Sequence, residues 1–383
     1  MSARAALLRA RDTAAAPVVT NAELFFDLVY VFAVTQLSHL LLHHLTARGA
    51  LETAILLAGV WWAWNYTAWA TNWIDPDKNP VRLLMIALML ISLLMSAAIP
   101  EAFHGRGLLF AIAYVLLGLV RGGFMVYALA GQRMGRNYAQ LTAWQAIAGI
   151  AWIAGAAVHG DARIALWLLA LALDYAAPLH GYALPGLGAT AMRDWTLIGG
   201  HLAERAQLVV MIALGESLLA VGATFSELPI DARTVAAFVT GFLTTVSLWA
   251  LYFTREAEAG ADAIAHAQVP TAVGRAAYAY AHLVMVGGII VTAVGIDLAI
   301  AHPTRDVSTA TAAVILGGPA LYLAGSTLFN RSLSGTLPRS RVSGILALAI
   351  ISPLAATLQA LPLLVAATIV LLAPALLGMR DRR

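Results

Sequence analysis

The chain has 383 residues, of which 61% are hydrophobic and 11% are charged, with a net charge of +3 and a mean hydropathy of +0.81. A soluble domain carries about a quarter charged residues, so the composition excludes a soluble protein and predicts an integral membrane protein. The small, scattered positive charge argues against a nucleic-acid partner, and the absence of cysteine excludes disulfides and thiolate metal sites.

Residues 1–20 contain several arginines and no long apolar core, so we interpret them as a cytosolic lead rather than a cleaved signal peptide. Apolar runs follow that are long enough to cross a bilayer, and each is continuously apolar, which favours helices over a β-barrel. We predict about twelve spans, near 23–45, 50–72, 81–100, 107–130, 138–158, 163–183, 201–222, 234–254, 276–300, 308–329, 342–360 and 362–379. Pro353 and Pro362 interrupt the last two ranges, which form either a broken hairpin or one long bent helix.

The positive residues predict the orientation of these spans. Alternate connecting segments and both termini hold clusters of arginine and lysine, whereas the intervening loops hold one arginine each. By the positive-inside rule the richer segments are cytoplasmic, which places both termini inside and requires an even number of spans. The richer set is Arg4, Arg9, Arg11, Lys78, Arg82, Arg133, Arg136, Arg193, Arg255, Arg275, Arg331, Arg339, Arg341, Arg380, Arg382 and Arg383.

The chain also shows weak internal similarity between its two halves. At an offset of 180 residues, "DLVYVFAVTQL" at Asp27 aligns with "QLVVMIALGES" at Gln207, and both segments are polar at the same two positions. We therefore predict an all-α polytopic protein built from two parallel six-helix repeats, 21–190 and 191–383. Chance similarity among membrane helices, which share a small alphabet, is the alternative.

The first span carries polar groups that are costly in hydrocarbon. Glu23 lies at its cytoplasmic mouth, where a carboxylate can simply cap helix amides and complement the helix dipole. Asp27 lies one turn deeper and needs a partner, while Gln36 points to roughly the opposite side of an ideal helix. Candidate partners for Asp27 are cationic or titratable residues elsewhere in the chain: Arg121, Arg205, Arg275 and His282.

Further buried polar residues complete a predicted proton, ion or substrate network. The full set is Glu23, Asp27, Gln36, Arg121, Asp174, Glu204, Arg205, Glu216, Arg275 and His282. Arg121 is expected to neutralise Asp27 or Asp174, and His282 is expected to exchange protons with one of them. The competing interpretations are helix capping for Glu204, snorkelling to lipid phosphates for Arg275, and structural salt bridges for the deeper groups.

No metal site is predicted. His39 and His43 have the spacing of two ligands on one helix face, but no third ligand lies within reach in the sequence. The chain has no glycine-rich loop of the GxxxxGK[ST] form, so ATP drive is not expected, and no motif points to a particular cofactor.

Three segments carry a family resemblance. "ELFFDLVYVFAVTQLSHLL", "HLAERAQLVVMIALGESLLAVG" and "RAAYAYAHLVMVGGIIVTAVG", in this order, resemble the bacterial low temperature requirement protein A family over essentially the whole chain. The resemblance implies a multi-pass protein of the cytoplasmic (inner) membrane of a bacterium and brings no established substrate or reaction. The signature positions that it implies are Glu23, Asp27, Gln36, Glu204, Arg205, Gly215, Glu216, Arg275 and His282.

These features favour a secondary transporter, proton-coupled through the buried carboxylate, histidine and arginine network between the repeats. The alternative is an intramembrane enzyme in which Asp27, Glu216 and His282 are catalytic, with a carboxyl as general acid on a lipid or isoprenoid-like substrate. A third hypothesis is a membrane scaffold or channel without turnover. The expected partners are membrane lipid and a small-molecule or lipid-like substrate.

Overall fold

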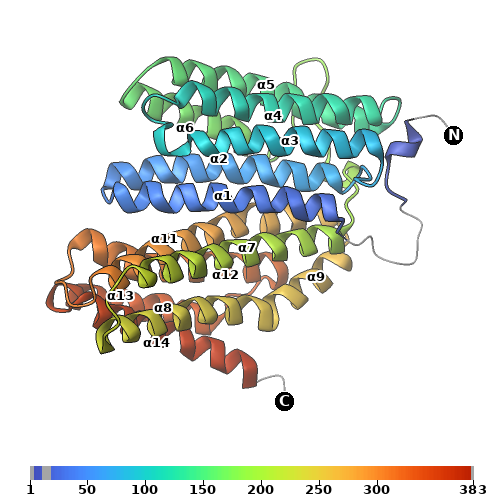
Figure 1. Cartoon of the computed structure of the whole chain (residues 1–383). Coiled ribbons are helices and arrows are strands. Elements are labelled where there is room, and N and C mark those ends of the chain that lie inside the picture. Colours follow the sequence, from blue (N-terminus) through green and yellow to red (C-terminus); the bar gives the residue numbers. More distant parts are fainter. Residues whose placement is uncertain (1–3, 11–18, 381–383) are drawn as a thin grey trace. The chain divides into compact units, whose positions relative to one another are not determined.

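The computed structural model describes residues 4–10 and 19–380, and within them it contains helices and no strand (Figure 1). This confirms the predicted helical class. In hydrocarbon every backbone N–H and C=O must be satisfied inside the chain, and a helix does so within one segment. Most of the predicted N-terminal lead, with Arg11, and the terminal Arg382 and Arg383 lie outside the described residues.

The helices follow one another with short connections. The first half holds α1 (Asn21–His43), α2 (Ala47–Thr71), α3 (Asn79–Ala98), α4 (Gly107–Ala128), α5 (Arg133–Ala157) and α6 (Asp161–Ala176). The second half holds α7 (Gly199–Ser226), α8 (Ala232–Leu251), α9 (Ala257–Ala265), α10 (Pro270–Val273), α11 (His282–Ala301), α12 (Thr309–Ser334), α13 (Arg339–Ile351) and α14 (Ala360–Arg380). Two π-helical segments, Tyr252–Glu256 and Gly274–Ala281, and four short 3₁₀ turns complete the described structure.

Eight helical stretches within the described residues are long and apolar enough to cross a membrane. They are Asn21–His43, Asn79–Glu101, Gly107–Ala128, Gly199–Ser226, Ala232–Ala265, Pro270–Ala301, Thr309–Ser334 and Arg339–Thr357. The other four predicted ranges also hold helices. However, α6 is short at 16 residues, α2 contains four tryptophans and one asparagine, and α5 contains two tryptophans, two glutamines and one asparagine. The count of twelve spans and their orientation therefore stay predictions.

The two prolines near the C-terminus separate two helices. Pro353 lies in the 3₁₀ turn Ser352–Thr357 that follows α13, and Pro362 lies in the first turn of α14. Proline is tolerated in a first turn, where its missing N–H has no helical partner, but it disrupts a helix interior. The alternative of one long bent helix is therefore wrong.

The chain divides into two compact units, which we describe separately. Unit 1 comprises Met1–Leu37, Leu51–Arg205 and Ala267–Ala272, and unit 2 comprises Ser38–Ala50, Ala206–His266 and Val273–Arg383. A boundary between the units falls inside α7, directly after Arg205. The predicted division into repeats at 21–190 and 191–383 stays a prediction.

In unit 1, α4 packs between α3 and α5, and α5 packs against α6 (Figure 1). Trp152 and Trp167 are fully buried, with ring centroids 5.3 Å apart. Arg163 is also buried, and its guanidinium donates to backbone carbonyls of Ala102, His104 and Gly155, among others. Helix ends leave carbonyls without helical partners, so this arginine satisfies them inside an aromatic core.

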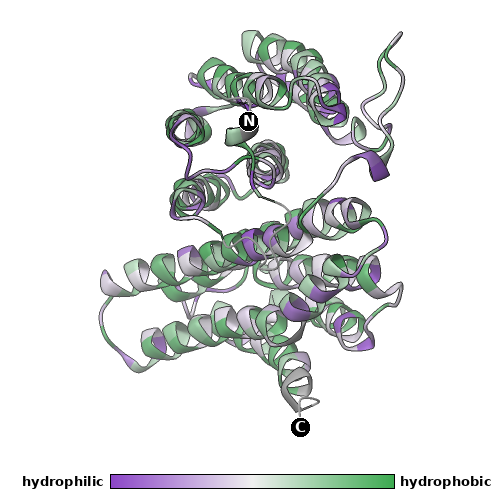
Figure 2. Ribbon diagram, turned by 90° about the vertical axis from the view of Figure 1, so that its right-hand side faces the viewer, coloured by the Kyte–Doolittle hydropathy of each residue, from purple (hydrophilic) through white to green (hydrophobic). Residues whose placement is uncertain are grey.

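In unit 2, α11 and α12 form the closest helix pair, and small residues allow their backbones to approach. A Cβ atom added to Gly288 would lie 2.4 Å from the backbone nitrogen of Tyr322, and one added to Gly318 would lie 2.4 Å from that of Thr292. Such contacts are typical of helix packing in membranes. Figure 2 shows that hydrophobic residues cover most of the length of the helices in both units.

Candidate functional site

The best-defined buried polar site lies in unit 1, where α1, α2 and the start of α7 meet. Arg205 and Asp27 form a two-point ion pair: Nε donates to Oδ2 at 2.9 Å and Nη2 donates to Oδ1 at 2.6 Å. Both side chains are 0% exposed. Among the four candidate partners of Asp27, the structure thus selects Arg205, whose planar fork matches a carboxylate.

Glu23 serves two purposes in this site. Its Oε2 accepts the backbone N–H and the hydroxyl of Thr20, and the Glu23 N–H donates back to Thr20 Oγ1, which is a capping box at the start of α1. The same oxygen accepts Nη2 of Arg9 at 2.6 Å, while Oε1 accepts Nε2 of His201 at 2.9 Å and Nη1 of Arg205 at 3.2 Å. Capping is therefore present, but it accounts for only part of the role of Glu23.

Hydrogen bonds define the tautomer of His201. The Asn72 side chain is oriented by the backbone of Ile198, because Oδ1 accepts the Ile198 N–H and Nδ2 donates to the Ile198 carbonyl. Nδ2 also lies 3.2 Å from Nδ1 of His201 and can only donate there. His201 therefore accepts at Nδ1 and donates from Nε2 to Glu23, which describes a neutral imidazole.

These contacts satisfy every carboxylate oxygen of the pair Glu23 and Asp27. Trp64 Nε1 donates to Asp27 Oδ1 at 2.7 Å, and the remaining Nη1 bond of Arg205 goes to Thr71 Oγ1 at 3.0 Å. With His201 neutral, the two carboxylates balance the two guanidinium groups of Arg9 and Arg205. We call these residues, with Asn72, the α1–α7 network: Arg9, Glu23, Asp27, Trp64, Thr71, Asn72, His201 and Arg205.

Two predicted members of unit 1 lie on other helix faces. Glu204 is half-buried and accepts the backbone N–H of Val19 at 3.4 Å. Gln36 is half-buried, nine residues beyond Asp27 on α1. Adjacent positions on a helix point about 100° apart, so Arg205 enters the α1–α7 network and Glu204 does not.

Arg121 and Asp174 are buried in unit 1, but the predicted ion pairs of Arg121 are absent from the described residues. Its Nη1 donates to the carbonyl of Ala63 and to Thr67 Oγ1, both at 3.0 Å. Asp174 Oδ2 instead accepts Tyr114 Oη at 2.7 Å and Trp152 Nε1 at 3.2 Å. Asp174 is thus held by neutral donors and Arg121 by a carbonyl and a hydroxyl, while Arg121 Nη2 has no hydrogen-bond partner among the described residues.

Three predicted residues belong to unit 2. His282 is 0% exposed, with Nδ1 2.9 Å from the Ala277 carbonyl and Nε2 2.9 Å from Tyr252 Oη. Its hydrogen bonds are thus made within unit 2, whereas Asp27 and Asp174 belong to unit 1. Glu216 is buried and Arg275 is half-buried.

The structure also contains a buried ion pair that the sequence interpretation missed. Glu256 and Arg341 lie in unit 2, 3.2 Å apart from Oε1 to Nη2, and both are buried. We had placed both residues in cytoplasmic segments next to predicted spans, where charge is ordinary. Two signals were available in the sequence. Glu256 comes shortly after the predicted span 234–254, and Arg341 comes directly before the predicted span 342–360.

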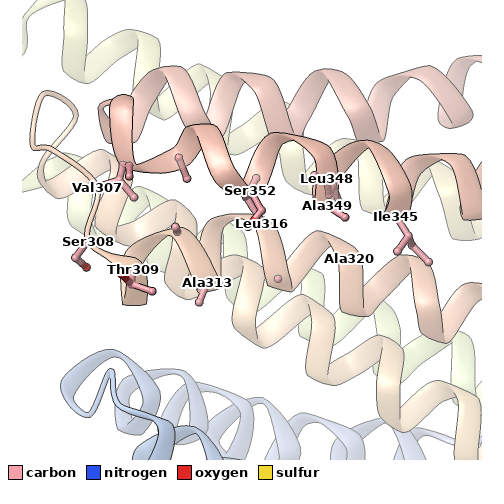
Figure 3. Close-up of a pocket in the computed structure, with 14 residues that line it drawn as sticks. Val307, Ser308, Thr309, Ala313, Leu316, Ala320, Ile345, Leu348, Ala349 and Ser352 are labelled. Atoms are coloured by element: carbon pink, nitrogen blue, oxygen red, sulfur yellow. The ribbon is translucent and has the colours of Figure 1, made fainter.

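Unit 2 also has a groove of about 410 Å³ between α12 and α13 (Figure 3). Its walls are small or apolar residues, among them Ala313, Leu316 and Ala349, and none of the fourteen is ionisable. The groove therefore does not include the predicted carboxylates. No group of three potential metal ligands occurs among the described residues, and Nδ1 of His43 lies 2.7 Å from the His39 carbonyl.

One comparison with known proteins identifies a family, and a second finds a similar protein. The profile described as "Bacterial low temperature requirement A protein (LtrA)" matches residues 18–376. The chain is also 40% identical over 329 residues to "Uncharacterized protein RA0937" of Rhizobium meliloti (strain 1021), which covers 84% of this chain and 80% of the relative. No solved structure matches.

Proposed function

Because the chain belongs to the bacterial low temperature requirement A family of membrane proteins, we propose that it is a proton-coupled secondary transporter in which His201 takes up the proton. The substrate is a small or lipid-like molecule. The observation that carries the proposal is the position of His201, a fully buried neutral imidazole hydrogen-bonded inside a charge-balanced network.

Charge balance makes proton uptake consequential. Among the described residues the network holds two carboxylates and two guanidinium groups, so a proton on His201 adds one positive charge that none of them compensates. A charge without a counterion costs several kcal/mol in a low-dielectric interior. The protonated network must therefore rearrange or bind an anionic group, and that requirement couples the proton to a second event.

The geometry indicates where the rearrangement starts. The proton adds at Nδ1 of His201, which faces an N–H of Asn72 at 3.2 Å. Two donors cannot share this contact, so His201 or Asn72 must move. Asn72 also holds the backbone of Ile198, the residue directly before α7. Proton uptake would thus release the start of the helix that carries Arg205.

Proton flux in liposomes tests this function. The purified chain is reconstituted with a trapped pH indicator, and small-molecule fractions of a bacterial extract are added outside. We expect at least one fraction to change the internal pH with the wild-type chain and with His43→Gln, an exposed control, but not with His201→Gln. Folded wild-type protein that moves no protons with any fraction would contradict the proposal.

The enzyme alternative has less support from this site. A general acid must release a proton, but each oxygen of Glu23 and Asp27 already accepts a donor, and Asp27 is bound at two points by a permanent cation. The network therefore supports a proton-responsive charge arrangement better than acid catalysis by Asp27.

A further inference from the structure

Another buried carboxylate, Glu256 of unit 2, has very different hydrogen bonding from Glu23 and Asp27 of unit 1. It lies at the end of the π-helical segment Tyr252–Glu256 and is 3% exposed. Ser326 and Asn330 from α12 and Arg341 from α13 surround it. All of these residues belong to unit 2.

Glu256 lies inside a π-helical turn, on the buried face of its helix. The N–H of Ala257 bonds to the carbonyl of Tyr252, five residues back, so the turn contains one residue more than an α-helical turn. Glu256 follows Tyr252 by four residues and Leu248 by eight, and all three are buried on one face. Arg341 Nη2 reaches both Glu256 Oε1 at 3.2 Å and the carbonyl of Leu251 at 3.3 Å.

The two oxygens of Glu256 are not equivalent. Oε1 accepts Ser326 Oγ at 2.5 Å, Asn330 Nδ2 at 2.8 Å, and Nε and Nη2 of Arg341 at 3.3 and 3.2 Å. Oε2 is buried and has no hydrogen-bond partner among the described residues. In the α1–α7 network, by contrast, all four carboxylate oxygens accept at least one donor.

This asymmetry matches a carboxyl group that gains and loses a proton. In a carboxylic acid one oxygen is the carbonyl acceptor and the other carries the proton, and four donor contacts on Oε1 with none on Oε2 fit that division. An ionised carboxylate spreads its charge over both oxygens, so a buried oxygen without a donor is costly. The O–H of the neutral acid would also lack a partner among the described residues, but an unpaired neutral hydroxyl costs less to bury than an unpaired charged oxygen.

The groups that influence Glu256 come from several elements. Arg341 is the facing cation, Tyr322 of α12 and Tyr252 of its own segment are the nearby phenols, and His282 bonds to Tyr252. The residues Ala360–Leu376 of α14, which also packs against the π-helical segment, contain no ionisable side chain. Arg341 is therefore the group whose charge proton uptake by Glu256 would leave uncompensated.

We propose that Glu256 is the proton-binding carboxyl of unit 2 and that the proton adds at Oε2. The step converts the carboxylate and one proton into the neutral acid, breaks no covalent bond, and leaves Arg341 charged. The inference rests on the proposed function for its physiological meaning, since it adds a second proton site to a proton-coupled transporter.

Infrared difference spectroscopy on the purified full-length protein tests it directly, because the carbonyl stretch of a protonated carboxylic acid is distinct from that of a carboxylate. We expect a protonated-acid band that grows as the pH falls in the wild-type protein and is absent in Glu256→Gln. Glutamine keeps a carbonyl for the four donors, so this variant should fold. A band that persists in Glu256→Gln, or no band in the wild type, overturns the proposal.

Ser326→Ala provides a matched second variant that keeps the acid. It removes one donor to Oε1, so the band should remain but shift in position, whereas Asp77→Asn, which changes an exposed carboxylate, should leave both its intensity and its position unchanged. An unshifted band in Ser326→Ala, or a band lost in Asp77→Asn, overturns the assignment. The infrared band reports protonation of Glu256 and not transport. A protein that shows the band but transports nothing would therefore contradict the proposed transport function and leave the assignment of Glu256 intact.

Discussion

Arg205 and Asp27 lie 178 residues apart in the chain, yet they form a fully buried ion pair with two hydrogen bonds of 2.9 and 2.6 Å. The same guanidinium also reaches Glu23 and Thr71, so it joins α1, α2 and α7 within unit 1. One side chain thus connects the capping box of α1 to the first turns of α7.

Replacing Arg205 with glutamine should destabilise the protein strongly. The change leaves Asp27 buried without its cation, and breaking a buried pair in this way costs about 3–5 kcal/mol. Thermal unfolding of the detergent-solubilised variant, followed by tryptophan fluorescence, measures the loss. The double variant Asp27→Asn with Arg205→Gln should regain part of it, because no lone charge remains. Strict additivity of the two single effects would contradict a direct pair.

Replacing Asn72 with alanine should loosen the chain just before α7. The Ile198 N–H and carbonyl both lose their side-chain partner, and leaving buried groups unsatisfied costs about 1–3 kcal/mol. Hydrogen exchange in the peptide that contains Ile198 should accelerate. Asn65→Ala, within α2, which ends just before Asn72, is the control, because Asn65 Oδ1 makes no hydrogen bond to the described residues. Equal acceleration in both variants would show that the hydrogen bonds of the Asn72 side chain do not hold Ile198 in place.

Alanine at Gly318 should destabilise the α11–α12 pair, and alanine at the adjacent Gly317 should not. The new methyl at position 318 would lie 2.4 Å from the backbone of Thr292, whereas position 317 has no atom within 4 Å. Forcing extra volume into such packing costs about 1–3 kcal/mol. Unfolding temperatures of the two variants, measured side by side, provide the check. A similar decrease for both would show that the close backbone approach at Gly318 is not responsible, because alanine favours a helix more than glycine does.

Asp231 should make the start of α8 sensitive to acid. Its Oδ1 accepts the N–H groups of Arg233 and Thr234, and these backbone hydrogen bonds lower the pKa of the carboxyl from its usual value. The pKa of Asp231 is therefore lower in the folded state than in the unfolded state. The ionised cap stabilises the helix at pH values above the unfolded-state pKa, and this contribution is lost as the pH falls through the folded-state pKa. Hydrogen exchange at Arg233 and Thr234 should therefore increase at low pH relative to the intrinsic rate.

Asp231→Asn is the matched control for that pH dependence. Asparagine caps a helix nearly as well as aspartate and carries no titrating group, so the acid-induced increase should disappear. An identical pH response in this variant would show that another group is responsible.

The sequence predicted some of the contacts because their signals are local. Thr20 and Glu23 have the spacing of a capping box, and the first turn of α1 contains it. Asp27 lies in an apolar run and therefore required a partner, and Arg205 was among the four candidates. Which candidate pairs with it depends on how helices pack, and no local pattern records that.

Other contacts lay beyond prediction for the same reason. His201 opens a predicted span, but its neutral state follows from Asn72, 129 residues away. Glu256 comes two residues after the predicted span 234–254, where a charged residue gives no sign of burial. Its burial reflects the packing of α12 and α13 around it.

The sequence by itself determined the membrane class, the helical architecture and the family, because apolar composition, run length and motifs are properties of the chain alone. Tertiary structure alone decided which charges meet: Asp27 with Arg205, Glu256 with Arg341, and Arg121 with a carbonyl and a hydroxyl instead of an acid. The physical reason is that a buried charge must find compensation somewhere, but only the packing of distant helices determines which group supplies it.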